Sequence, residues 1–110
     1  MATLFRNVLT SGLGATPTTV LTTTLGVKTT VVGLSLTNVT STVLLASVKL
    51  IDAVQGTEAF YVQNVLIPQN QSLRVVTGGE RLVLGPNTGV VITSSLDDSI
   101  DLVISLVEIS

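Results

Sequence analysis

The segment Ile100-Asp101-Leu102-Val103-Ile104-Ser105-Leu106-Val107-Glu108-Ile109 is the strongest indicator of the architecture of this chain. Successive side chains of a β-strand point to opposite faces, so an apolar residue at nearly every position gives a strand with two apolar faces. The two sets are Leu102, Ile104 and Leu106 on one face and Val103, Val107 and Ile109 on the other. Such a strand is either central in a stack of sheets or covered by another subunit. We therefore predict a buried strand over 100–109.

Alternation of apolar residues with Thr and Ser continues through the rest of the chain. Val, Leu, Ile and Thr suit a pleated, half-buried surface, and turn signals recur roughly every ten residues. Further strands are expected over 3–10, 18–25, 28–37, 42–51, 58–67, 72–76, 80–84 and 88–94. The pattern predicts an all-β chain, with residues 1–110 forming a single domain. The expected architecture is one antiparallel β-sandwich, jelly-roll or Ig-like, of about eight or nine strands.

The same alternation predicts faces and turns. Within 28–37, Val32 is expected on the same face as Leu34 and Leu36. Within 42–51, one face is expected to carry Leu44, Ala46, Val48 and Leu50. Two short loops are predicted to be hairpin turns because glycine readily adopts positive φ. They are Gln55-Gly56, and Gly78-Gly79 between 72–76 and 80–84.

The composition excludes most chemistry. The chain has no His, Cys or Trp, its charged residues are 11% of the sequence, and its net charge is −2. The five basic residues are scattered and three aromatic rings give no stacking platform, so no nucleic-acid partner is expected. No apolar run approaches the ~18 residues of a membrane helix, so no membrane association is expected either. A Ser or Thr nucleophile needs an activating base, and without His we expect no enzyme activity.

Asp97, Asp98 and Asp101 form the one acidic cluster in the sequence. Hard cations bind carboxylate oxygens, but calcium loops supply more ligands at closer spacing. Asp and Ser also bond to their own backbone in turns, so a polar turn entering the last strand is the preferred interpretation. Single glutamates such as Glu58, Glu80 and Glu108 give no carboxylate pair. No catalytic, cofactor-binding or metal site, and no cofactor, is therefore expected.

The aromatic pair Phe60-Tyr61 leaves a second function class open. Adjacent strand residues face opposite ways, and Phe60 is expected to point inward with Val62. A receptor- or carbohydrate-binding sandwich would stack a sugar on an aromatic ring and bond it through amides and acids. Its candidate residues are Tyr61, Asn64, Asn87 and the Asp97-Asp98 turn. With so few aromatic rings, this hypothesis ranks second to a structural one.

Several segments resemble small β-sandwich virion proteins of tailed bacteriophages. The segments are Tyr61-Val62-Gln63-Asn64-Val65-Leu66-Ile67-Pro68, Ser72-Leu73, Gly79-Glu80-Arg81-Leu82-Val83-Leu84 and Asp101-Leu102-Val103-Ile104-Ser105-Leu106-Val107-Glu108-Ile109-Ser110, with Leu34 to Asn38 as a further match. The resemblance implies a capsid decoration, neck or tail component without a catalytic site.

Composition and resemblance lead to one functional prediction. Neutral Thr and Ser surfaces desolvate at lower cost than charged ones, so identical copies can cover them. We expect a structural protein that acts by oligomerisation and surface burial in the particle. Its expected partners are copies of itself and other virion proteins (major capsid or neck/tail proteins). Its expected location is the virion, assembled in the host cytoplasm.

Overall fold

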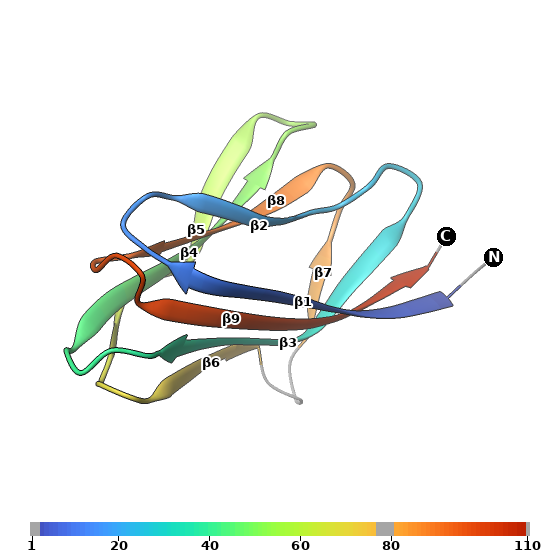
Figure 1. Cartoon of the computed structure of the whole chain (residues 1–110). Helices are drawn as coiled ribbons and strands as arrows, with labels where there is room; N and C mark the ends of the chain where they lie inside the picture. The colour runs from blue at the N-terminus through green and yellow to red at the C-terminus, as the bar shows by residue number, and fades with distance from the viewer. Residues whose placement is uncertain (1–2, 77–80, 110) are drawn as a thin grey trace.

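The protein, described by a computed structural model over residues 3–76 and 81–109, is all-β (Figure 1). Two antiparallel sheets pack face to face as a β-sandwich, as predicted. The strands are β1 (Thr3–Leu13), β2 (Thr18–Thr22), β3 (Lys28–Asn38), β4 (Leu44–Asp52), β5 (Thr57–Ile67), β6 (Ser72–Val76), β7 (Leu82–Leu84), β8 (Thr88–Ser94) and β9 (Ile100–Ile109). The first sheet has the order β1-β9-β3-β6 with β7 also on β3, and the second has the order β2-β8-β4-β5.

The connectivity is that of a jelly roll. β4 pairs with β5, β3 with β6 and β7, β2 with β8, and β1 with β9. Taken in order outward from the β4–β5 turn, these antiparallel pairs form one long hairpin. Folding that hairpin over itself brings β3 beside β9 and β4 beside β8, which completes the two sheets. Of the two expected topologies, the strand order is therefore jelly-roll rather than Ig-like.

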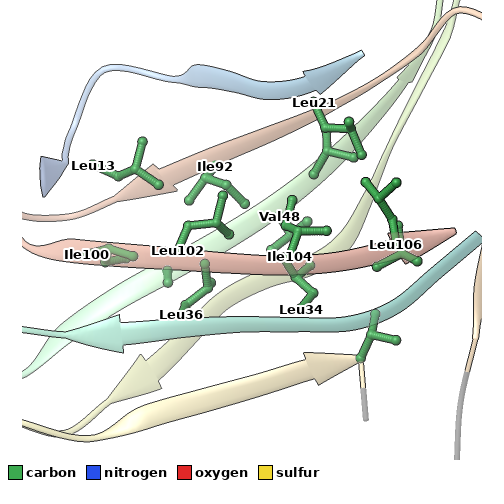
Figure 2. Packing of buried hydrophobic residues seen from close by; sticks show 14 of the residues in the cluster. Leu13, Leu21, Leu34, Leu36, Val48, Ile92, Ile100, Leu102, Ile104 and Leu106 are labelled. Atoms are coloured by element: carbon green, nitrogen blue, oxygen red, sulfur yellow. The ribbon is translucent and has the colours of Figure 1, made fainter. Parts of the chain in front are cut away.

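The core lies between the two sheets (Figure 2). β9 lies between β1 and β3. Its residues Leu102, Ile104 and Leu106 are buried, as predicted for the strand over 100–109. Leu44, Ala46 and Val48 meet them from β4, and Leu50 packs at the margin. The described core contains no aromatic ring, so the sandwich is held by branched aliphatic side chains.

The prediction for Val32 is wrong. Val31 pairs with Leu106 and Gly33 pairs with Ser105, so β3 has one more residue than β9 at this point. This bulge reverses the alternation. Val31 is 2% exposed while Val32 is 36% exposed.

The two predicted hairpins have different outcomes. Gly56, at φ 71°, closes the β4–β5 turn, where its N–H donates to the Asp52 carbonyl at 2.8 Å. The predicted hairpin between 72–76 and 80–84 is wrong, because β6 and β7 both pair with β3, one after the other along the same side. Residues 77–80, which include Gly78 and Gly79, lie outside the described residues.

Asn38 anchors the end of β5. Its side chain is fully buried, and its Nδ2 donates to the carbonyls of Thr42 (2.8 Å), Ile67 (3.1 Å) and Pro68 (3.2 Å). Its Oδ1 accepts from the N–H and hydroxyl of Thr40 at 2.9 and 2.7 Å. The end of β3 is thereby tied to the end of β5 by a polar group with every bonding position used.

Candidate assembly interface

The acidic cluster forms a turn, as predicted. Asp97 Oδ1 accepts from the N–H of Ala15 at 3.1 Å, and Asp101 Oδ1 accepts from the N–H of Gly12 at 3.2 Å. Asp98 holds a positive φ of 49°. Asp97 therefore holds the β8–β9 turn to the β1–β2 loop, and Asp101 holds the start of β9 to the end of β1. Among residues 3–76 and 81–109, no three His, Cys, Asp or Glu side chains come together as a metal site would require.

The glutamates lie apart and pair with basic side chains. Glu108 accepts from Arg6 at 2.7 Å, and Glu58 accepts from Lys49 at 3.3 Å. The first pair lies on β9 and β1, the second on β5 and β4. Glu80 lies outside the described residues. These arrangements bring no two glutamates together for acid–base chemistry.

The residues considered for sugar binding are dispersed. Asn87 precedes β8 and the Asp97-Asp98 turn follows it, so they lie at opposite ends of that strand. Tyr61 and Asn64 lie on β5, at the edge of the second sheet. The structure does not assemble these groups into one site.

The inward orientation predicted for Phe60 is wrong. Val48 pairs with Val62 but the next residue, Lys49, pairs with Phe60, so Tyr61 is an extra residue in β5. The shift sends Phe60 to the outer face, where it is 50% exposed and its ring lies 5.7 Å from Lys49 Nζ. A cation at this distance is attracted to the ring face.

The outer side of β1 and β9 carries no charge over eight paired residues. Two residues that pair across neighbouring strands lie on the same face of the sheet. Because every second residue of β9 is buried, the residues between them, and their partners on β1, point outward. The outward residues, here named the neutral face, are Thr3, Phe5, Asn7, Leu9, Val103, Ser105, Val107 and Ile109. Phe5 is 76% exposed and Leu9 is 72% exposed, beside Val107 and Val103 respectively.

The neutral face continues onto β3 and its neighbours. Val32 and Val83 are exposed there, and the charged side chains of this region are Lys28, Arg74 and Asp101. An open hollow of about 360 Å³ lies over the bulge of β3, lined by Val32, Ser35, Arg74 and Ser105 among others. The surface is therefore uneven and mostly uncharged, as a protein-contact surface is at its centre.

Among the described strands, the edges of the two sheets differ in regularity. β2, β5 and β6 each contain at least one register shift, and β7 has three residues. β5 has two shifts and a positive φ of 50° at Asn64. β1 pairs with β9 without a shift from Thr3 to Thr10, and its irregularity begins only after Thr10. Bulges and charges protect edge strands from pairing, so β1 is the least protected described edge.

Comparison with known proteins identifies the fold. No protein-family model and no curated protein matches the sequence significantly. A protein of Bacillus endospore appendages, described as a novel family of disulfide-linked pili, is similar over 98% of this chain and 88% of its own, at 12% identity and a TM-score of 0.54. A chain of the T13 viral particle of IBDV is similar over 96% of this chain and 30% of its own, at 13% identity and a TM-score of 0.56.

These similarities show the fold and nothing finer.

No helix within residues 3–76 and 81–109 has the length and apolar character of a membrane span. The chain is an all-β sandwich of the kind also found in a pilus protein and a viral particle.

Proposed function

We propose that this chain is a non-enzymatic structural protein that acts by oligomerisation and by burial of its surface in a large protein assembly. The observation that carries the proposal is the neutral face. Its eight outward residues on β1 and β9 have no charge, and two of them are large, apolar and mostly exposed. Covering such a face removes apolar surface from water without stripping a charge of its hydration.

The finer proposal is a virion protein of a tailed bacteriophage, acting as a capsid decoration or cement protein or as a neck or tail component. The resemblance of the sequence to small virion proteins of tailed bacteriophages supports it, and the described residues of its segments lie mainly on β3, β5, β6, β7 and β9. The two solved neighbours, one from pili and one from a viral particle, are compatible with a structural role. The partners would be copies of this chain and the major capsid or neck/tail proteins, with assembly in the host cytoplasm.

Two features of the chain limit how it can assemble. Disulfide linkage, as described for the endospore pili, is not open to it because it contains no cysteine. We also propose that it has no catalytic, cofactor-binding or metal site. We propose that its contacts are non-covalent, with standard interfaces of about 1,600 Å².

The experiment is to measure the mass of the purified protein in solution and its binding to particles of the phage that carries its gene. We expect an oligomer, or co-sedimentation with the particles, and several copies per virion by quantitative mass spectrometry. A monodisperse monomer that neither binds the particles nor occurs in them would contradict the proposed function.

A further inference from the structure

The free edge of β1 is long and regular, whereas edge strands exposed to solvent are usually short, bulged or charged. Thr3–Thr10 pairs with β9 on one side, and its other side is the end of the first sheet. Unpaired backbone N–H and C=O groups along such a row form a template for another strand. The side chains beside it include Leu4, Phe5 and Leu9, all exposed.

Charge does not protect this edge. Arg6 is the one charged residue from Thr3 to Leu13, and its guanidinium is bonded to Glu108 of the same chain at 2.7 Å. The ion pair leaves the edge with little net charge to repel a second copy. The long edge strand β5 also carries one ion-paired charge, Glu58, but unlike β1 it is interrupted by two register shifts.

We propose that β1 pairs antiparallel with β1 of a second copy, so that the two first sheets become one continuous sheet. The inference rests on the proposed function, for which it names one interface. A two-fold axis through Asn7 places Phe5 opposite Leu9 of the second copy, Arg6 opposite Val8, and Asn7 opposite Asn7. Aromatic–aliphatic pairs directly opposite each other stabilise a sheet, and here two such pairs form by symmetry.

Other antiparallel registers fit the side chains less well. A two-fold axis through Arg6 would place two arginines opposite each other, which is destabilising. An axis through Val8 would place Phe5 opposite Ser11, and the pairing would then run into Gly12, whose φ is 70°. The axis through Asn7 uses the regular part of β1 and extends the neutral face across both copies. The occupant of the edge is therefore a second copy of this chain.

A single cysteine tests the interface and its register together. The chain has no cysteine of its own, so an Asn7→Cys variant can form a disulfide only between copies. Opposite residues in an antiparallel pair have Cα atoms about 4.5–5.5 Å apart, which is within the range of a disulfide. Gln63→Cys, at an exposed position on the β5 edge, is the matched control.

Under mild oxidation we expect Asn7→Cys to form a covalent dimer at least tenfold faster than Gln63→Cys. Urea unfolding of the reduced variants checks that both are folded. If the wild type is oligomeric or binds particles and the two variants cross-link at equal rates, the β1 pairing is wrong while the proposed function stands. If the wild type is a monomer without particle binding and Asn7→Cys does not cross-link, both are wrong.

Discussion

Strands β1 and β5 are the same length and both lie at the end of a sheet, yet they present opposite kinds of edge. β5 contains two register shifts and a left-handed residue at Asn64. β1 is regular from Thr3 to Thr10 and exposes Phe5 and Leu9. The two edges thus differ in the regularity of the backbone that another strand would pair with. The geometry of the backbone separates them.

Placing charge on the β1 edge should have the largest effect on self-association. In the pairing through Asn7, the double variant Phe5→Lys/Leu9→Lys puts two lysines opposite each other twice per dimer. We expect self-association to weaken by about a thousandfold, or about 4 kcal/mol, because two apolar contacts are lost and like charges meet. Sedimentation velocity across a concentration series measures this.

The matched control carries the same change at the β5 edge. Phe60→Lys/Leu66→Lys replaces two exposed residues of β5. Its association should stay within about threefold of the wild type. Equal weakening by both double variants would show that β1 has no special role.

Release of the end of β5 gives the next largest effect. Asn38→Ala removes the donor to the carbonyls of Ile67 and Pro68 and leaves buried groups unpaired. We expect the free energy of unfolding to fall by about 3 kcal/mol, measured by urea denaturation. Gln63→Ala, at an exposed side chain, serves as the control and should cost under about 0.5 kcal/mol. A loss below about 1 kcal/mol for Asn38→Ala would mean that this bonding does not hold the end of β5.

The difference in backbone between the two edges can be tested by making the same Asn→Val substitution once on β5 and once on β1. Asn64→Val places a β-branched residue at φ 50°, and we expect it to cost about 1–2 kcal/mol of stability. Asn7→Val lies on regular strand and should change stability by less than about 0.5 kcal/mol. Asn64→Gly also removes the asparagine side chain, but glycine adopts a positive φ without steric strain. It should therefore cost less stability than Asn64→Val. Equal costs at the two asparagines would contradict the difference in backbone.

The ion pairs of the two edges should have the smallest effect. Arg6→Gln removes the partner of Glu108, and Lys49→Gln removes the partner of Glu58. Each pair has one side chain that is about half exposed to solvent, so each change should cost about 0.5 kcal/mol and less at high salt. Thermal unfolding at low and high ionic strength checks this. A loss well above 1 kcal/mol for Arg6→Gln would show that this pair, in which Glu108 is 17% exposed, stabilises the fold more than a surface ion pair does.

The strands could be predicted from sequence because alternation of apolar residues with Thr and Ser is a local signal. Nine predicted strands overlap the nine that form, including the central one over 100–109. The errors lie where a strand has one residue too many. Val32 and Tyr61 each add a residue to one strand of a pair, and an extra residue reverses every face beyond it. A strict two-residue period contains no sign of such a bulge.

The neutral character of the surface was also predictable, but not its position. Low charge is visible in the composition, whereas the edge position of β1 depends on its pairing with β9, about a hundred residues away in the chain. The same long-range order explains the wrong hairpin, since β6 and β7 are both held by β3 rather than by each other. Edges and faces are properties of the sheet order, which local patterns do not specify.

Whether the β1 edge joins copies of this chain can be decided by a mixing experiment followed by native mass spectrometry. Phe5→Lys/Leu9→Lys and Phe5→Glu/Leu9→Glu should each be dissociated alone, because like charges then meet across the two-fold axis. Mixed in equal amounts, they should form a heterodimer, because each introduced lysine then lies opposite an introduced glutamate of the other variant. A mixture that stays dissociated, or variants that associate alone as well as the wild type does, would contradict the β1 pairing.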